Sequence, residues 1–285
     1  MGQRETGNWK WETGNGGTGT RVATVKQSGL KDALSWCRAM FVFAPLIYLY
    51  TVVLGTLSLL SSIFERKGRV QHWFARTWAW LILRTCLSPV YVAGADKIDL
   101  TKPCVYAANH ISALDIPVLY VYLPKQFRII AKKELFRYPF LGWHLRRSGQ
   151  LSIDQANPTS AIRSLRQAVE TLRAGMPLVI FPEGGRSETG QMQPFMSGAF
   201  YLAIKAQVNI VPLAIVGTYE IVPMNHFHIR PGRIELHVGE PISTSGLGLH
   251  DIEQLSKRVQ RAVEDMYYAH SSVGDPRKAA ATSAD

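Results

Sequence analysis

The sequence predicts an α/β protein in which a mixed, largely parallel sheet with flanking helices is preceded by a long apolar helical segment. Two observations support this prediction. From about residue 90 onward, apolar runs of strand length alternate with helical patterns. Before them, residues 39–64 contain no charged side chain. Alternating strands and helices are typical of mostly parallel sheets with helices packed on their faces.

The expected strands are short, apolar and bounded by glycine, proline or polar residues. They are VYVAG (90–94), PCVYAAN (103–109), FRIIAKK (127–133), QLSID (150–154), PLVIFPEG (177–184), IVPLAIVG (210–217) and RIELHVGE (233–240). Helical patterns cover 158–175 and 197–207. The first begins near Pro158 and ends at Gly175, which are common start and stop residues. In such sheets, chemistry lies on loops at strand ends.

The uncharged segment 39–64 predicts a membrane-anchoring helix. As one helix, its 26 residues would rise ~39 Å, against ~30 Å for the hydrocarbon core of a bilayer. It is therefore long enough to span with tilt. Because Pro45 and Gly55 can bend it, a re-entrant or interfacial helix is an alternative, as is a buried helix of a soluble core.

The stretch 66–89 mixes tryptophans with basic residues. Trp73, Trp78 and Trp80 lie among arginines and one lysine. This mixture is typical of an interfacial helix, in which rings lie at headgroup level and cations meet phosphates. The alternative is a packed helix with three core tryptophans. We favour the interface because the neighbouring segment is so apolar.

The charge balance indicates an anionic partner. The 285 residues include 32 Lys and Arg against 21 Asp and Glu, for a net charge of +11. The partner is either nucleic acid or an anionic membrane surface. Since the chain carries a long apolar run and no recognisable nucleic-acid motif, we expect the membrane surface and no nucleic acid. The three cysteines form no CxxC pair, so we expect neither a zinc site nor a disulfide framework.

Two further sequence patterns, one rich in glycine and one with two histidines, are only weak evidence for a nucleotide or metal site. Residues 14–19 match GxGxxG, but no strand precedes them and no helical pattern follows, so a flexible tail is expected rather than a nucleotide site. His226 and His228 alternate as metal ligands sometimes do, but no third ligand is placed and a strand surface is expected. We therefore expect no metal site.

The first loop with candidate chemistry contains AANHISALDIP, residues 107–117. Five helical residues turn ~500°, so His110 and Asp115 would diverge by ~140° within one helix. They can pair only if His110 lies in the turn before a helix, and Pro117 fits a first helical turn. An aspartate on one ring nitrogen would fix the tautomer and leave the other nitrogen free. The alternatives are a general base with its partner and a histidine beside a helix cap.

The second candidate loop is LVIFPEGGRSETG, residues 178–190. Two glycines let the backbone approach a ligand closely, and Arg186 offers a planar fork suited to phosphate. Glu183 is expected to orient Arg186 or accept a substrate hydroxyl. The alternative is a tight turn with a surface ion pair. Lys132 lies in a basic segment that is either a solvated face or a contact for anionic lipid.

In their order along the chain, these blocks resemble the 1-acylglycerol-3-phosphate O-acyltransferase family, the PlsC-like glycerolipid acyltransferases. The matches are NHxxxxD (Asn109, His110, Asp115), FPEGxRS (Phe181, Pro182, Glu183, Gly184, Arg186, Ser187), VPxxI (Val211, Pro212, Ile215) and a Lys-rich AKKEL…PFxG segment (131–142). The resemblance covers roughly residues 40–245. Each block alone is modest, but the ordered set is highly specific.

Three positions depart from the family pattern. In a further family block, which falls on residues 149–155 here, Ser152 replaces an aromatic residue and Gln155 replaces an arginine that the family associates with the acceptor's phosphate. Glutamine keeps hydrogen bonding and loses the charge, for which Arg186 or Lys132 would compensate. In the FPEGxRS block, Gly185 stands where threonine is usual.

The resemblance implies a glycerolipid acyltransferase-like fold and an enzyme that moves an acyl group from acyl-CoA or acyl carrier protein to the free hydroxyl of 1-acyl-glycerol-3-phosphate. It implies His110 as general base with Asp115 as its partner, and no cofactor beyond the acyl donor. The expected substrate-binding residues are Asn109, Lys132, Glu183, Gly184 and Arg186. The alternatives are another lysolipid acceptor, such as a lyso-ornithine lipid, and a non-catalytic membrane-binding protein of the same fold.

These inferences divide the chain into four parts. We expect a disordered tail over 1–35, an N-terminal membrane-anchoring helical segment over 36–88, an acyltransferase catalytic domain over 89–272 and a flexible C-terminus over 273–285. The catalytic domain is expected on the cytoplasmic side of the membrane, which would be the inner membrane in a bacterium.

Overall fold

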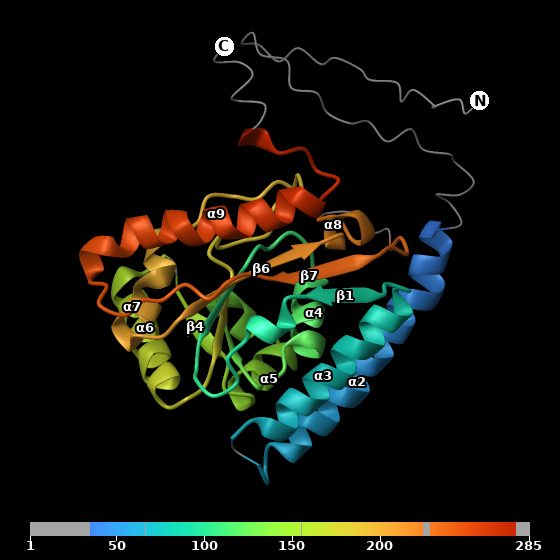
Figure 1. Cartoon of the computed structure of the whole chain (residues 1–285). Coiled ribbons are helices and arrows are strands. Elements are labelled where there is room, and N and C mark those ends of the chain that lie inside the picture. The colour runs from blue at the N-terminus through green and yellow to red at the C-terminus, as the bar shows by residue number, and fades with distance from the viewer. Residues whose placement is uncertain (1–34, 66, 155, 225–228, 278–285) are drawn as a thin grey trace, which may run out of the picture.

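The computed structural model describes residues 35–65, 67–154, 156–224 and 229–277. Within them lies one seven-stranded sheet with the order β1-β7-β6-β2-β5-β3-β4 (Figure 1). The strands are β1 (Val90–Ala93), β2 (Val105–Ala108), β3 (Arg128–Lys132), β4 (Leu151–Ile153), β5 (Leu178–Ile180), β6 (Ile210–Val216) and β7 (Ile234–Val238). Each lies inside a run that the sequence predicts as a strand.

Five neighbouring strands are parallel and two are reversed. β6, β2, β5, β3 and β4 run in one direction, as shown by the pairings β2–β6, β2–β5, β3–β5 and β3–β4. β7 is antiparallel to β6, and β1 is parallel to β7. The predicted mixed, largely parallel sheet is therefore confirmed.

The helices lie between the strands or flank the sheet. They are α2 (Ala44–Ser61), α3 (Arg69–Thr85), α4 (Asp115–Tyr122), α5 (Leu141–Arg147), α6 (Pro158–Arg173), α7 (Tyr201–Ala206), α8 (Thr218–Ile221) and α9 (Ile252–His270). A π-helical turn precedes α2 at Ala39–Phe43, and 3₁₀ turns occur at Ala95–Lys97, Lys133–Arg137, Ser197–Phe200 and Leu249–Asp251.

Both faces of the sheet are covered, because its side chains alternate between two apolar layers. Tyr106 and Ala108 of β2 join the layer formed with α3 and α4. Val105 and Ala107 of the same strand join the layer formed with α6, α7 and α9. In Figure 1, α9 and the α2–α3 pair accordingly lie on opposite sides of the sheet.

α2 and α3 form a helical hairpin that is docked on the sheet domain through α3. Buried Ala75, Ala79 and Leu83 of α3 belong to the apolar layer that includes α4. Across the hairpin, Trp78 Nε1 donates a hydrogen bond to Thr51 Oγ1 at 2.9 Å. The hairpin is thus a fixed part of the fold whose outer helix, α2, projects away from the core.

The apolar helix predicted around residues 39–64 runs from Ser35 to Ser61, and only 6% of its most apolar window is buried. A buried helix of a soluble core does not fit this exposure. Its length and composition are sufficient to cross a membrane. In α3, Trp73 and Trp80 are exposed, whereas Trp78 is partly buried against the core, so the three tryptophans do not form a common core.

Several predictions lie outside the described residues. These are the tail before residue 35 with its GxGxxG match, Gln155, His226 and His228, and the C-terminus beyond residue 277. The flexibility of residues 273–285 stays a prediction; among them, Arg277 Nη1 donates to Asp265 of α9 at 2.7 Å. The other domain limits stay predictions.

Candidate active site

One edge of the sheet gathers the polar residues of the candidate loops. Because β6, β2, β5 and β3 are parallel neighbours, their carboxyl ends meet at the same edge. That edge carries Thr218 after β6, His110 after β2, Glu183 after β5 and Lys132 at the end of β3. Residues far apart in the sequence therefore converge on one site.

The centre of this edge is a histidine–aspartate pair. His110 Nδ1 lies 2.9 Å from Asp115 Oδ2. Asp115 is the first residue of α4, with Pro117 in the same helical turn, so His110 precedes the helix as its spacing predicts. The His110 side chain is 15% exposed and that of Asp115 is fully buried. Since an ionised carboxylate only accepts, Nδ1 carries the proton and Nε2 has the free lone pair.

The Asp115 carboxylate accepts four hydrogen bonds. Oδ2 accepts from the backbone N–H groups of Ile111 and Ser112, both at 2.8 Å, besides His110 Nδ1. Oδ1 accepts from Thr218 Oγ1 at 2.6 Å. Asp115 does not cap α4, whose N-cap residue Leu114 has no side-chain cap hydrogen bond; its carboxylate instead binds the turn that precedes the helix. This coordination fixes the carboxylate, and through it the plane of the imidazole.

Thr218 was not among the predicted site residues. It begins α8, directly after β6 and Gly217. Gly217 has a φ of 88°, and a Cβ there would lie 2.2 Å from the Arg233 carbonyl oxygen. Glycine is thus required for the turn that brings Thr218 to Asp115. The only signal in the sequence is a hydroxyl residue after a Val-Gly strand end, which is too common to be diagnostic.

Two residues of the second loop hold His110. Phe181 stacks on the imidazole, with ring centroids 4.0 Å apart and an interplanar angle of 22°. The backbone N–H of His110 donates to Glu183 Oε1 at 2.7 Å, and Gln193 N–H donates to Glu183 Oε2 at 2.8 Å. In return, the backbone N–H of Ser187 donates to the His110 carbonyl at 3.0 Å. The two loops therefore form one unit.

Glu183 binds the protein backbone. The sequence instead predicts a contact with substrate or with Arg186. Its side chain is buried, and both carboxylate oxygens already accept backbone hydrogen bonds. Burial raises the pKa of Glu183 to about 8, although the hydrogen bonds from Gln193 and His110 act in the opposite direction. We assign Glu183 to the positioning of His110.

Asn109 is also placed differently from its prediction. The residue is fully buried. Its Nδ2 donates to the Ile215 carbonyl at 2.9 Å, and its Oδ1 accepts from the Ile215 N–H at 2.7 Å. Both polar atoms of the buried Asn109 side chain thus bind β6. It joins the ends of β2 and β6 instead.

The cations that face outward at this edge are Arg186 and Lys132. Both residues are exposed. Within the described part of the chain, the Arg186 guanidinium has no hydrogen-bond or ion-pair partner. A Cβ at Gly185 would lie 3.7 Å from Lys132 Nζ, so the lysine reaches the loop that carries Arg186. Gly184 turns this loop with a φ of 73°. Arg186 and Lys132 can thus meet an anion together.

Comparison with known proteins gives the family. The acyltransferase family model matches residues 89–216. The 1-acyl-sn-glycerol-3-phosphate acyltransferase of Saccharomyces cerevisiae is 31% identical over 215 residues, which are 74% of this chain and 71% of the yeast protein. The chain belongs to the 1-acyl-sn-glycerol-3-phosphate acyltransferase family. The resemblance drawn from the sequence blocks is confirmed.

Two further members of this acyltransferase family support the assignment. The chloroplastic 1-acyl-sn-glycerol-3-phosphate acyltransferase BAT2 of Brassica napus is 30% identical over 216 residues, and the chain spans only 61% of its length. The crystal structure of the 1-acyl-sn-glycerophosphate acyltransferase PlsC from Thermotoga maritima has a TM-score of 0.68 and 27% identity. That match covers 82% of this chain and 93% of the PlsC chain, so the predicted fold class is confirmed.

Ser152, one of the positions that depart from the family pattern, lies on β4 beside the end of β3. Lys132 pairs with Ile153 between β3 and β4, and Ser152 pairs with Ala131. Lys133 Nζ forms an ion pair with Asp154 at 3.0 Å. Ser152, which replaces the family's aromatic residue, therefore lies on β4, and β3 separates it from β5 and the loop of Arg186.

Neither of two cavities in the described residues is lined by His110. One, of about 250 Å³, is lined by Lys102, Cys104, Asn209 and neighbouring residues at the amino ends of β2 and β6. The other, of about 240 Å³, lies beside β7. The His110 side chain is instead 15% exposed at the edge of the sheet.

Proposed function

We propose that this protein transfers an acyl group from a thioester to the free hydroxyl of 1-acyl-sn-glycerol-3-phosphate. The observation that carries the proposal is the 2.9 Å contact between His110 and buried Asp115. The same sheet edge also presents two exposed cations, Arg186 and Lys132. The names of the relatives in yeast, Brassica napus and Thermotoga maritima agree with this acceptor. The donor is acyl-CoA or acyl carrier protein.

His110 acts as the general base in this proposal. An alcohol is a poor nucleophile at neutral pH, so it must lose its proton as it attacks. His110 Nε2 takes that proton while the hydroxyl oxygen bonds to the thioester carbon. The carbon–sulfur bond then breaks, and the leaving thiolate takes the proton from the imidazolium. No covalent enzyme intermediate is required, and the sequence contains no GxSxG nucleophile motif.

Asp115 stabilises the imidazolium that forms during the reaction. Its carboxylate is held by Thr218 and two backbone N–H groups, so it does not need to reorganise as the charge appears on His110. Phe181 and Glu183 are positioning residues that fix the face and the backbone of His110. Preorganisation of this kind lowers the barrier without any movement of the protein.

Arg186 and Lys132 bind the acceptor headgroup. A guanidinium offers a fork of N–H donors that matches phosphate, and an exposed ammonium adds a point charge. Gln155, which stands where the family has an arginine, favours a second candidate acceptor: a lysolipid without phosphate, such as a lyso-ornithine lipid. The two acceptors differ in the charge that Arg186 would meet.

The exposed apolar helix α2 anchors the protein to the membrane that holds acceptor and product. Many of its apolar side chains, among them Leu49, Val53 and Leu57, are exposed, and the net charge of +11 favours an anionic membrane surface. The catalytic domain would then lie on the cytoplasmic side.

An acceptor panel tests the proposal. Purified protein in detergent is given acyl-CoA or acyl carrier protein donors and lysolipids with and without a phosphate headgroup. We expect acyl transfer to 1-acyl-sn-glycerol-3-phosphate, its loss in His110→Ala, and its retention in His250→Ala, which alters an exposed histidine away from the site. Transfer only to lysolipids without phosphate would establish the second candidate. No transfer to any acceptor by folded protein would contradict both.

A further inference from the structure

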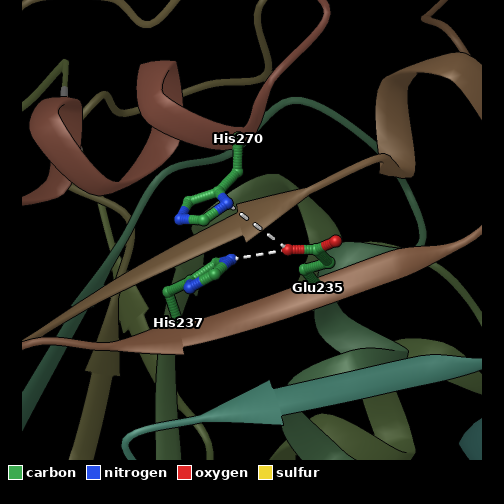
Figure 2. A group of neighbouring side chains, drawn as sticks. All are labelled: Glu235, His237 and His270. Carbon is green, nitrogen blue, oxygen red and sulfur yellow. Dashed lines mark hydrogen bonds and ion pairs between the residues drawn. The ribbon is translucent and has the colours of Figure 1, made fainter.

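A second cluster of reactive side chains lies on β7, apart from the site of His110. Glu235, His237 and His270 each point one ligand atom at a common space, and these atoms all lie within 4.8 Å of one another. His237 Nε2 is 2.9 Å and His270 Nδ1 is 3.7 Å from the same oxygen, Glu235 Oε2. Figure 2 shows both imidazoles turned toward that carboxylate.

The fold explains why these residues meet. Glu235 and His237 are two positions apart on β7, so they share one face of the strand. Ile234, Leu236 and Val238 point to the opposite face, into the layer with α3 and α4. Glu235 and His237 therefore face the α9 side, where His270 is the last residue of α9. The imidazoles of His237 and His270 stack with centroids 4.0 Å apart.

We propose that Glu235, His237 and His270 bind a late first-row divalent cation of the Zn²⁺ class. Two imidazole nitrogens and one carboxylate oxygen form a ligand set that suits such ions. Ligands ~2.0–2.1 Å from a tetrahedral ion lie about 3.4 Å from each other. The two nitrogen–oxygen distances, 2.9 and 3.7 Å, bracket this value. Because the two imidazoles stack at an interplanar angle of 20°, their in-plane lone pairs converge on one ion only after a ring rotates, which is easiest for half-exposed His270.

Groups around the cluster support a site with an open position. Arg233 Nε binds the other carboxylate oxygen, Glu235 Oε1, at 3.0 Å. This ion pair directs Oε2 toward the histidines. It also reduces the negative charge that Glu235 offers to a cation. A cavity of about 240 Å³ adjoins Glu235 and His270 and is also lined by Glu220 and Ser272, which hydrogen bond to each other. Water or a small anion could occupy the fourth position from this cavity.

A bound cation would join the edge of the sheet to the end of α9. That end already contacts the loop after β5, because Tyr267 OH donates to the Gly190 carbonyl at 2.7 Å. The inference goes beyond the proposed function and does not depend on it, since none of the three ligands contacts His110, Asp115 or Arg186 through a hydrogen bond or ion pair in the described residues. The role assigned to the cation is structural.

The test is direct metal binding to the full-length protein after removal of bound metal with a chelator. Zn²⁺ is titrated by calorimetry, and Co²⁺ is followed through its visible absorption. We expect one more bound equivalent in the natural protein than in the double variant His237→Ala/His270→Ala, and at least ~10-fold weaker binding in Glu235→Gln. Zn²⁺ should also raise the melting temperature of the natural protein and not that of the double variant.

Two control variants and one substitute variant make the result specific. His250→Ala removes an exposed histidine elsewhere and should leave the extra equivalent intact, as should His110→Ala, which removes the proposed catalytic base. If the double variant does not fold by circular dichroism, His270→Gln at the exposed helix end replaces it. Equal binding by the natural protein and the folded variants would overturn the proposal and assign the cluster to ordinary ion pairs. The outcome is the same whether or not the protein transfers acyl groups.

Discussion

Thr218 donates a hydrogen bond to Asp115 at 2.6 Å, across 103 positions of sequence. The residue that orients His110 is therefore held from β6, the neighbouring strand, as well as from its own loop. Asp115 is fully buried, and a buried carboxylate is costly unless its oxygens are satisfied. The threonine supplies the one donor to Oδ1 that the structure describes.

Thr218→Val should impair both stability and turnover. Valine has nearly the same shape but leaves Asp115 Oδ1 without this donor, so we expect a loss of about 1–3 kcal/mol in the free energy of unfolding. Because the imidazole is then held less firmly, kcat should fall by about 10-fold or more while KM for the acceptor changes little. Thr218→Ser, which retains the hydroxyl, should restore kcat; equal loss in both variants would show that the methyl group matters instead.

His110→Ala should reduce kcat by about 10²–10⁴-fold, the usual contribution of a general base. The measurement is acyl transfer at saturating donor and acceptor. Sedimentation with vesicles should be unchanged, because the side chain is remote from the exposed face of α2. A variant that keeps full activity would remove His110 from the role of base.

Arg186→Ala should raise KM for a phosphorylated acceptor by about 10–100-fold, since hydrogen bonds to charged groups are worth ~1.5–3 kcal/mol. KM for the thioester donor should stay close to its original value. The matched control is Arg166→Ala, which removes an exposed arginine on α6. If donor and acceptor binding weaken equally, Arg186 does not recognise the headgroup.

Glu183 gives stability a characteristic pH dependence. Burial raises its folded-state pKa to about 8 from an ordinary value of 4.5. Between these values the folded state holds a proton that the unfolded state releases, so this contribution is fully present below pH 4.5 and is lost as pH rises through 8.

Glu183→Gln cannot titrate and should lack this contribution. Melting temperatures of both proteins between pH 5 and 9 provide the measurement. We expect the natural protein to lose more stability over this range than the variant does, even if glutamine lowers stability at every pH by disturbing one backbone hydrogen bond. Parallel curves would mean that the carboxyl group has an ordinary pKa in the folded protein.

The exposed apolar face of α2 should control membrane binding. Leu49 and Val53 lie one helical turn apart and are 55% and 46% exposed. Replacing both with lysine should weaken partitioning into vesicles by about 100-fold or more, since a lysine at the centre of an inserted helix costs ~2.5–3.5 kcal/mol. Leu249→Lys, an equally exposed site on the other side of the protein, should have no such effect. Stronger binding of the α2 variant would indicate a purely electrostatic contact.

The sequence predicted the strands and both loops because the signals for them are local. The runs around β2 and β5 are apolar, and Asn-His and Pro-Glu-Gly follow them directly. The spacing of His110 and Asp115 required a turn before a helix, and the helix begins at Asp115.

Other features depend on contacts between distant segments and were not predictable in this way. Whether Asn109 and Glu183 face substrate or backbone is decided by Ile215 and Gln193, whose positions follow from the strand order. Nothing in the local pattern at Thr218 indicates Asp115 as its partner. The reversal of β7 against β6 likewise requires the tertiary fold, and it is this reversal that brings His237 beneath α9.

Asn109 acts as a substitute peptide unit, with one donor and one acceptor matched to the main chain of Ile215. An aspartate of equal size would keep the acceptor but set a second oxygen against a carbonyl, so only the amide can close this junction. Loss of this one amide nitrogen would therefore be felt well beyond Asn109 itself. Deamidation, to which asparagine is prone at elevated temperature, would exchange a single nitrogen for oxygen and loosen the two strand ends that lead to His110 and Thr218.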